Sequence, residues 1–238
     1  MKPKTLLMRR YYRMRGYINL RGLTVAVDTQ VVTDPILDSL WKDDYEVPEL
    51  RALSGLMRPS DRVLELGTGM GLVSGVMAKR HPQARFVSYE ANPTLAPVIA
   101  ALHQRNGIGN VALRSAIVAP LDQGTTRIFR MHRHFTEGSL VAQGADQGVA
   151  EVAVHDPAVV IAEVQPDLLL CDIEGGEEEL IPVLPMHGLR AAVIELHPAV
   201  VSRAGMARIF AAFHLAGLVP VVELSSATVV AFERVPAS

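Results

Sequence analysis

The sequence predicts a Rossmann-like α/β fold, in which a mostly parallel sheet carries helices on both faces. Three observations lead to this prediction. From residue 62 onward, short apolar strands alternate with helical patterns over short connections, as they do in doubly wound sheets. The first of these strands runs directly into three alternate glycines and a helix. The last two strands are joined only by residues 225–227, too few for a parallel crossover, so they must be antiparallel.

Turn signals and apolar spacing give the elements of the first half. Arg21-Gly22 lies between two short β-like segments, which predicts a hairpin. Two segments with helical apolar spacing follow, and the second has Pro48 at its start. Strands and helices then alternate after the break at residues 58–61. The expected elements are strands 17–20 and 23–27, helices 35–42 and 48–57, strand 62–66, helix 70–80, strand 85–90, helix 93–105 and strand 110–117.

The second half begins less regularly. Two strands flank the glycine-rich segment from Gly138 to Gly148, which is long enough to move and which we interpret as a substrate-side lid. The apolar run 167–173 then indicates a fully buried strand, and the last helix ends near Gly217. The expected elements are strands 126–131 and 150–154, helix 157–164, strand 167–173, helix 177–184, strand 191–196, helix 203–215 and strands 219–224 and 228–234.

Size and composition favour one large domain with a short appendage. The chain has 238 residues, of which 49% are hydrophobic and 20% charged, and it contains no apolar run of membrane-spanning length. We place a basic arm and hairpin at residues 1–44 and the main domain at residues 45–238. The single cysteine, Cys171, cannot form an internal disulfide, and no export signal is visible. These features predict a cytoplasmic protein without an integral membrane segment.

The charge is distributed unevenly along the chain. A net charge of −2 argues against general nucleic-acid binding. Residues 1–21, however, carry lysines and arginines interleaved with tyrosines, and no acidic residue precedes Asp28. The simplest interpretation is a solvated arm. Contact with an anionic substrate, with a membrane surface or with the partner subunit of a homodimer are three alternatives that stay open.

The glycines after the first core strand predict a nucleotide pocket. Gly67, Gly69 and Gly71 allow positive φ angles and close approach of a ligand, and the following helix presents unpaired N–H groups. A dinucleotide fingerprint would have its third glycine where Leu72 stands, which disfavours NAD. Glu65 adds a negative charge that would repel a pyrophosphate but suits a cationic sulfonium. S-adenosylmethionine therefore fits this loop better than NAD does.

An acidic residue ends the next strand as well. Glu90 lies about twenty residues beyond the glycines, where a carboxylate usually binds a ribose diol. The alternative interpretations are a glycine-rich turn without a ligand and a glutamate that merely begins a loop. Because strand, turn, helix and second strand follow in the required order, we interpret the segment as a nucleoside site.

Titratable residues follow two later strands. Asp172 and Glu174 stand two residues apart beyond one buried strand, and Glu195 and His197 stand two apart at the end of another. Ligands bind beyond the carboxyl ends of strands in such sheets, so these groups should face the reacting methyl group. A neutral His197, or a carboxylate with a raised pKa, could accept the proton of a hydroxyl.

Structural roles and a metal site are alternatives to a catalytic role for these residues. Glu177 is better explained by charge complementarity at a helix N-terminus, and Asp172 could be a capping residue. Asp172, Glu174 and His197 could also converge on a divalent ion, but spacing alone is weak support and no metal-binding motif is present, so no metal ligand is assigned. His132 and His134 receive no role.

Several motifs together resemble the FkbM-type family of S-adenosylmethionine-dependent methyltransferases, over roughly residues 45 to 235. The most specific is the segment 172–177, Asp-Ile-Glu-Gly-Gly-Glu, which differs from the family's Glu-Gly-Ala-Glu by one glycine. The resemblance also rests on segments 45–49, 90–93, 106–116 and 194–198. A seven-stranded sheet with a terminal antiparallel pair is typical of the class I methyltransferase fold rather than of dehydrogenases.

The resemblance implies O-methylation of a hydroxyl on a small molecule or carbohydrate. It places the glycine loop around the methionine portion of the cofactor, Glu90 on the ribose, and Asn92 and Ala116 beside the adenosine. The alternatives are a nicotinamide-dependent oxidoreductase and a non-catalytic nucleoside-binding protein. The expected cofactor-binding residues are Glu65, Gly67, Thr68, Gly69, Gly71, Glu90, Asn92 and Ala116, and the expected catalytic residues are Asp172, Glu174 and His197.

Overall fold

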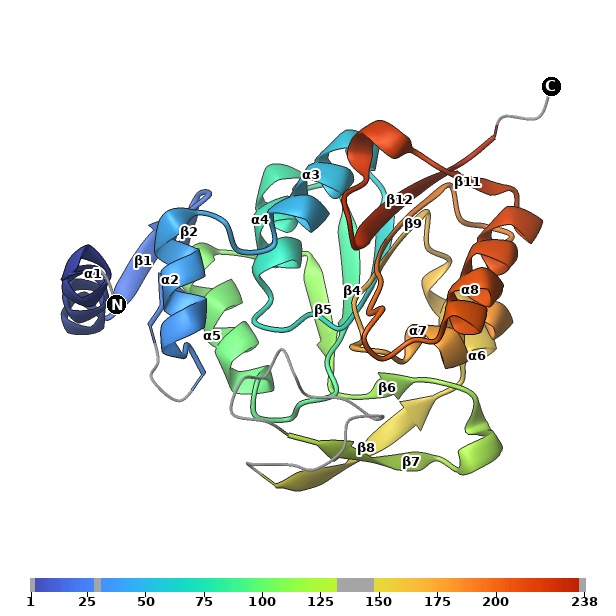
Figure 1. Cartoon of the computed structure of the whole chain (residues 1–238), viewed down its shortest axis with the longest axis horizontal. Helices are drawn as coiled ribbons and strands as arrows, with labels where there is room; N and C mark the ends of the chain where they lie inside the picture. The colour runs from blue at the N-terminus through green and yellow to red at the C-terminus, as the bar shows by residue number, and fades with distance from the viewer. Residues whose placement is uncertain (1–2, 28–30, 132–147, 236–238) are drawn as a thin grey trace.

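The computed structural model describes residues 3–27, 31–131 and 148–235. Its main feature is a seven-stranded sheet in the order β11-β12-β10-β9-β3-β4-β5, in which only β12 runs antiparallel to its neighbours (Figure 1). The strands are β3 (Arg62–Leu66), β4 (Arg85–Tyr89), β5 (Val111–Arg114), β9 (Leu168–Cys171), β10 (Ala191–Glu195), β11 (Leu218–Pro220) and β12 (Val229–Arg234). This confirms the expected Rossmann-like sheet with an antiparallel C-terminal pair, the class I methyltransferase fold.

Helices cover both faces of the sheet, as the alternation of elements predicted. The helices α3 (Val47–Leu56), α4 (Leu72–Arg80) and α5 (Ala96–Asn106) pack on one face, and α6 (Pro157–Val164), α7 (Glu177–Leu180) and α8 (Arg203–Leu215) pack on the other. Successive residues of a strand point to opposite faces. In β9, Leu168 and Leu170 accordingly belong to the first hydrophobic core, and Leu169 and Cys171 belong to the second.

Three predicted elements give way to another structure part of the way along. The strand expected at 110–117 divides into β5 and β6 (Ile117–Val118), and β6 joins a second sheet with β8 (Val149–His155) and β7 (Thr126–Arg130). Pro182 has no N–H to continue α7, so the chain goes on as a 3-10 turn over Ile181–Val183. A second 3-10 turn, Val222–Leu224, ends the strand expected at 219–224.

The N-terminal segment contains a helix that the sequence did not reveal. Residues Pro3–Arg15 form α1, which lies outside α2 (Asp34–Lys42) at the edge of the molecule (Figure 1). The predicted hairpin is confirmed as β1 (Tyr17–Leu20) paired with β2 (Leu23–Ala26), and its apolar side chains join the same core as α4. Asn106 of α5 donates to the carbonyl of Thr24 and accepts from its N–H, which anchors the hairpin.

Two expectations concern segments that are not described. His132, His134 and the glycine-rich segment up to residue 147 lie outside the described residues, so the proposed lid keeps the status of a prediction. Within the residues that the structure does describe, no helix combines the length and hydropathy needed to cross a lipid bilayer.

Candidate functional site

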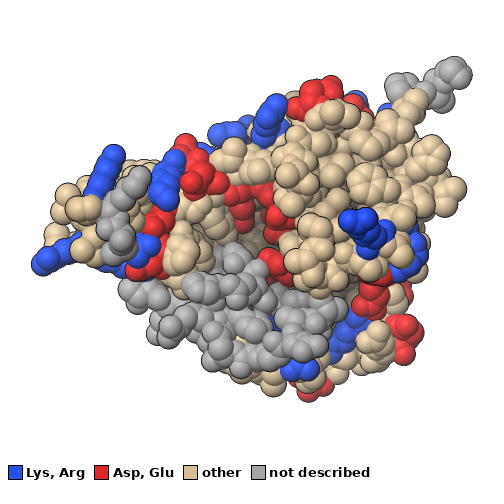
Figure 2. Space-filling view, viewed as in Figure 1, with Lys and Arg blue, Asp and Glu red and all other residues tan. Residues whose placement is uncertain are grey.

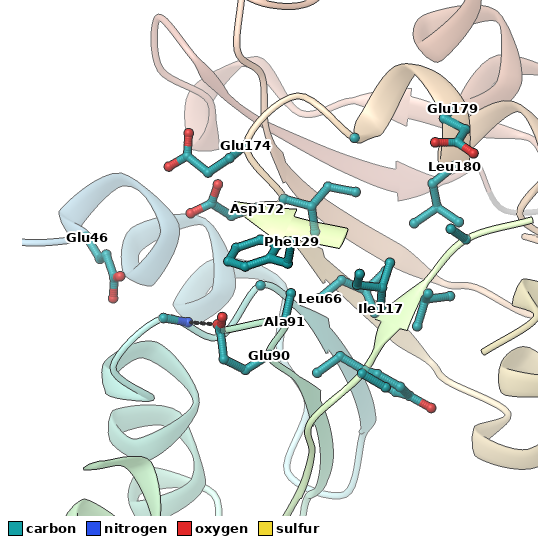
Figure 3. Close-up of a pocket in the computed structure, with 18 of the residues that line it drawn as sticks. Glu46, Leu66, Glu90, Ala91, Ile117, Phe129, Asp172, Glu174, Glu179 and Leu180 are labelled. Carbon is teal, nitrogen blue, oxygen red and sulfur yellow. Dashed lines mark hydrogen bonds between the residues drawn. The ribbon is translucent and has the colours of Figure 1, made fainter. Parts of the chain in front are cut away.

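A cavity opens at the carboxyl ends of β3, β4 and β9, where the fold predicts a ligand site (Figure 3). The empty space in it is about 910 Å³, part of it open to solvent, which is the size range of small-molecule sites. Red side chains gather in the hollow at the centre of the face shown in Figure 2. The walls include Tyr45, Glu46, Leu66, Gly67, Gly69, Tyr89, Glu90, Ala91, Ala116, Ile117, Phe129, Asp172, Glu174 and Glu179.

The glycine loop forms the floor of this cavity. Gly67 has φ +78°, and a Cβ atom there would lie 1.6 Å from the carbonyl oxygen of Asp172. No side chain fits at such a distance, so the loop and the strand end after β9 touch through the backbone. Gly69, with φ +54°, turns its N–H toward Glu90. Gly67 is therefore required by the close approach of two backbone segments, and Gly69 is favoured by its positive φ.

Glu90 is fixed at the end of β4 by backbone donors. The N–H of Gly69 donates to Oε2 at 2.8 Å, and the N–H of Asn92 donates to Oε1 at 2.7 Å. Burial raises the pKa of Glu90 to about 7, even though these hydrogen bonds favour the carboxylate. The side chain lines the cavity with its lone pairs still able to accept from a ligand hydroxyl.

Four predicted cofactor residues do not line the cavity. The carboxylate of Glu65 is only 1% exposed and accepts a hydrogen bond from the hydroxyl of Thr68 at 2.5 Å. Asn92 accepts from the N–H and hydroxyl of Thr94, so it caps the turn before α5. A Cβ at Gly71 would approach Ile99 at 2.9 Å. The cavity is thus lined by four of the predicted cofactor residues, Gly67, Gly69, Glu90 and Ala116. The other four support the glycine loop without lining the cavity, namely Glu65, Thr68, Gly71 and Asn92.

Several wall residues were given no role from the sequence, and three of them shape the cavity most clearly. Phe129 of β7 contributes to an apolar side of the cavity, in the same cluster as Ala91 (Figure 3). Tyr45 and Glu46 come from the turn before α3, where Glu46 has φ +50°. They lie in a segment that the family resemblance had included, but only the tertiary structure brings them to the cavity. Together these residues give the cavity one apolar side and one acidic side.

His197 lies at the centre of a group of carboxylates. Its Nδ1 is 2.8 Å from Oε1 of Glu177, which is completely buried. Its Nε2 is 3.4 Å from Oδ1 of Asp172 and 3.3 Å from Oε2 of Glu174. The structure thus brings together all three residues predicted to be catalytic and adds Glu177 as a fourth. Glu174 has φ +52°, the left-handed conformation that non-glycine residues rarely adopt.

The electrostatics of this group differ from the expectation of a neutral histidine. Burial works against protonation of His197, but the hydrogen bond and charge of Glu177, with the charges of Glu174 and Asp172, raise its pKa to about 9. His197 is then an imidazolium at neutral pH and cannot serve as a general base. Burial and the neighbouring charges of Glu195 and Glu174 raise the pKa of Asp172 well above its usual value. A carboxylate is therefore the better candidate for accepting a proton.

The cavity wall is acidic and lacks a cationic side chain among the described residues. Glu46, Glu90, Asp172 and Glu174 all face it, whereas Glu179 is paired with Arg127 at 2.6 and 2.8 Å. Burial and the charges of Glu49 and Asp172 raise the pKa of Glu46 well above its usual value. Oε2 of Glu46 is buried and has no hydrogen-bond partner in the described structure. Oδ1 of Asp172 is buried as well and makes no hydrogen bond there, although Nε2 of His197 lies 3.4 Å from it. Such groups call for a cation or a hydrogen-bond donor.

A metal is one such cation. One carboxylate oxygen each of Asp172 and Glu177 and one ring nitrogen of His197 lie within 4.8 Å of one another, so this group could hold an ion. The protonated ring of His197 already forms an ion pair with the carboxylate of Glu177 through Nδ1, so each of these two charges has a partner. The geometry is thus accounted for without a metal, and the group carries no metal assignment.

Comparison with known proteins gives similarities of fold. No protein-family model and no curated protein matches the chain. Precorrin-6Y C5,15-methyltransferase from Geobacter metallireducens is similar in structure, with 18% identity over 79% of this chain and 85% of that chain and a TM-score of 0.46. A methyltransferase from Pyrococcus furiosus is similar as well, with 13% identity over 98% and 100% of the two chains and a TM-score of 0.47.

A third similar structure is a TehB-like SAM-dependent methyltransferase from Corynebacterium glutamicum, with 13% identity, coverage of 83% of this chain and 93% of that chain, and a TM-score of 0.45. At such low identities and TM-scores, these similarities assign no activity to the chain.

Proposed function

We propose that the protein is an S-adenosylmethionine-dependent methyltransferase of the FkbM type, which transfers a methyl group to a hydroxyl of a small molecule or sugar. The observation that carries the proposal is the cavity at the glycine loop, which is lined by carboxylates and by no lysine or arginine among the described residues. A cationic nucleoside suits such a wall. A bound cation favours the ionised form of these carboxylates, whereas the pyrophosphate of a nicotinamide cofactor disfavours it.

The residues present fit this cofactor. Glu90 would bind the ribose diol, and Ala91, Ala116 and Phe129 offer apolar surface to an adenine ring. The buried, unpartnered oxygen of Glu46 suits the ammonium group of the methionine portion. Gly67 and Gly69 keep the floor free of side chains, so that the methionine portion can pass close to the backbone.

The chemistry requires a proton acceptor beside the methyl donor. When bound, the cofactor supplies an electrophilic methyl group on a cationic sulfur. Asp172 lines the cavity, and its Oδ1 makes no hydrogen bond within the described structure. Its raised pKa makes it a stronger base than an ordinary aspartate once ionised. His197 holds that carboxylate and Glu174 in place through Nε2, and Glu177 fixes the ring through Nδ1. Glu174 would bind the acceptor hydroxyl.

Ligand-induced stabilisation tests the cofactor. S-adenosylhomocysteine at about 100 times its Kd should stabilise the native state by about 2.7 kcal/mol and raise Tm by about 5–10 °C. NADH at the same concentration should leave Tm unchanged, because no lysine or arginine among the described residues lines the cavity to pair with its pyrophosphate. Differential scanning fluorimetry measures both. Stabilisation by NADH without stabilisation by S-adenosylhomocysteine would favour the oxidoreductase alternative.

Substitution of Asp172 tests the chemistry separately from cofactor binding. Asp172→Asn should lower the rate of S-adenosylhomocysteine release, across a panel of monosaccharides and small hydroxylated acceptors, by about 100-fold because the proton acceptor is lost. The Kd for S-adenosylhomocysteine should change little. Asp167→Asn is the matched control, since Asp167 precedes the same strand and pairs with Arg62. Equal rates in both variants would show that Asp172 accepts no proton, and absence of turnover in the wild type would favour a non-catalytic binding protein.

A further inference from the structure

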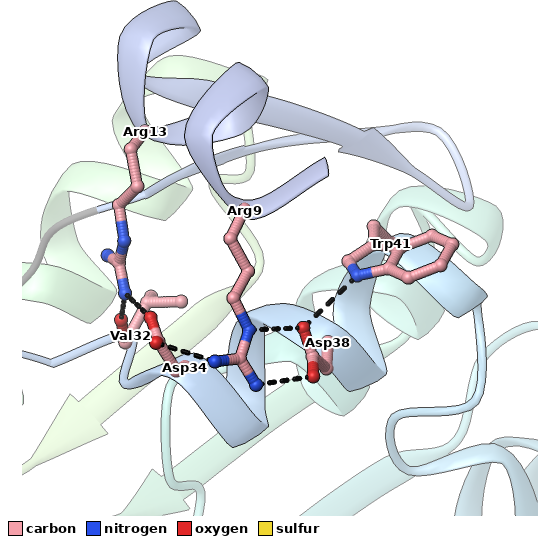
Figure 4. A network of polar contacts seen from close by, with 6 residues as sticks. All are labelled: Arg9, Arg13, Val32, Asp34, Asp38 and Trp41. Carbon is pink, nitrogen blue, oxygen red and sulfur yellow. Dashed lines mark hydrogen bonds and ion pairs between the residues drawn. The ribbon is translucent and has the colours of Figure 1, made fainter. Parts of the chain in front are cut away.

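Helix α1 is attached to the rest of the protein by a face that carries Arg9 and Arg13 (Figure 4). The partly buried Tyr12 of α1 also packs against the hydrophobic core. Arg9 donates to both carboxylate oxygens of Asp38, at 2.8 and 2.6 Å, and to Asp34 at 2.7 Å. Arg13 donates to the carbonyl of Val32 at 2.6 Å and to Asp34 at 3.2 Å. No residue of α1 is buried. Two arginines and their acidic partners on α2 therefore orient the helix.

A second group of apolar side chains on α1 points away from this attached face. Leu7, Tyr11 and Met14 are spaced by four and three residues, so they share one face. Their exposed fractions are 67%, 46% and 80%, and the neighbouring Leu6 is 58% exposed. An amphipathic helix of a globular protein normally turns such a face toward the core. Here this apolar face is turned toward the outside, and the ion pairs of Arg9 and Arg13 keep the helix in that orientation.

Cations flank this exposed apolar face. Lys4 and Arg10 lie three residues before and after Leu7, and Arg15 lies four residues after Tyr11. All three are exposed. Arg15 donates to the hydroxyls of Tyr11 and Tyr17, which keeps its guanidinium beside the apolar face. Helix α1 contains no acidic residue. The exposed surface therefore has an apolar centre and a positively charged border.

We propose that α1 docks the protein on an anionic lipid surface, with Leu7, Tyr11 and Met14 at the level of the acyl chains and Lys4, Arg10 and Arg15 among the headgroups. An apolar centre bordered by lysine and arginine is the pattern of helices that lie in the membrane interface. A second copy of the chain fits less well, since two such faces would bring six cations together. Nucleic acid fits less well because the centre of the face is apolar rather than charged.

Vesicle co-sedimentation of the full chain tests this proposal. Binding to vesicles of phosphatidylcholine and phosphatidylserine, mixed roughly three to one, should exceed binding to phosphatidylcholine alone by about tenfold and should weaken in high salt. The double variant Leu7→Asp/Met14→Asp should lose at least about tenfold of this binding, since each change removes apolar area and adds an anion. Because both positions are exposed, its Tm should equal that of the wild type.

The matched control carries the same change at exposed apolar positions outside α1. Leu215 and Val222 are 86% and 79% exposed, so Leu215→Asp/Val222→Asp should leave vesicle binding unchanged. The proposal is overturned if the wild type does not bind the anionic vesicles, or if both double variants bind them equally. It is also overturned if sedimentation equilibrium without lipid shows a dimer that Leu7→Asp/Met14→Asp dissociates, or if RNA but not lipid retains the protein.

Discussion

Gly67→Ala is expected to lower the free energy of unfolding by about 3 kcal/mol or more. Two costs add up. The left-handed conformation at φ +78° costs an alanine about 1–2 kcal/mol, and the new Cβ would lie 1.6 Å from the carbonyl oxygen of Asp172. Since that neighbour is backbone, relief requires a shift of the strand end after β9, which adds about 1–3 kcal/mol. Urea denaturation of the purified variant measures the sum.

Gly16→Ala separates the two costs. Gly16 has φ +77°, nearly the same as Gly67, but a Cβ there meets no atom within 4 Å. The free energy of unfolding of Gly16→Ala should therefore fall only by the conformational cost, about 1–2 kcal/mol. The difference between the two variants measures the steric contact of Gly67 with Asp172. Equal losses would mean that the loop has room that the structure does not show.

The same substitution also tests how the site is built. Any shift of Asp172 would move its carboxylate relative to His197 and the cavity. Folded Gly67→Ala protein should therefore bind S-adenosylhomocysteine more weakly than Gly16→Ala does. A 1 Å displacement can be costly for chemistry that depends on positioning. If Gly67→Ala binds the ligand as the wild type does, the contact between the loop and β9 has no role in the site.

The sheet and the glycine loop could be predicted because local signals and the global fold agree. Apolar runs, turn residues and glycine spacing each point to the same elements in the same order, and the short final connection determines the direction of β12. The predicted clustering of Asp172, Glu174 and His197 depends on one further rule, that parallel strands end at one edge. These three residues lie on neighbouring strand ends, as the rule requires.

Other features depend on contacts that no local pattern encodes. Helix α1 escaped prediction because Arg9 and Arg13 lie on its inward face while Leu7 and Met14 are exposed, which departs from the usual periodicity. Glu65 lies in a motif that suggests ligand contact, yet its carboxylate accepts a hydrogen bond from the hydroxyl of Thr68 within the loop. Phe129 reaches the cavity from a second sheet. The charge of His197 is determined by Glu177, twenty residues earlier in the chain.

The pairing of Glu177 with His197 predicts a large, pH-dependent effect on stability. Glu177→Gln should destabilise the protein by about 3 kcal/mol near pH 6 and by much less near pH 9.5. The pKa of His197 is about 9 in the folded protein, above its ordinary value of 6.5. A raised pKa stabilises the native state fully below the unfolded pKa, and this contribution is lost as pH rises through the folded value. Removing the charge of Glu177 removes its principal cause, so the loss should appear at low pH.

Two measurements distinguish this from a simple packing defect. The NMR titration of the His197 ring should move from about pH 9 toward its ordinary value of 6.5, because the largest influence that raises the pKa is removed while burial still lowers it. The control is Glu178→Gln, one residue along α7, where the carboxylate pairs with the half-exposed Arg208. That variant should cost about 0–1 kcal/mol at either pH. If Glu177→Gln loses the same stability at both pH values, His197 is neutral in the native protein, and the imidazole rather than Asp172 becomes the candidate base.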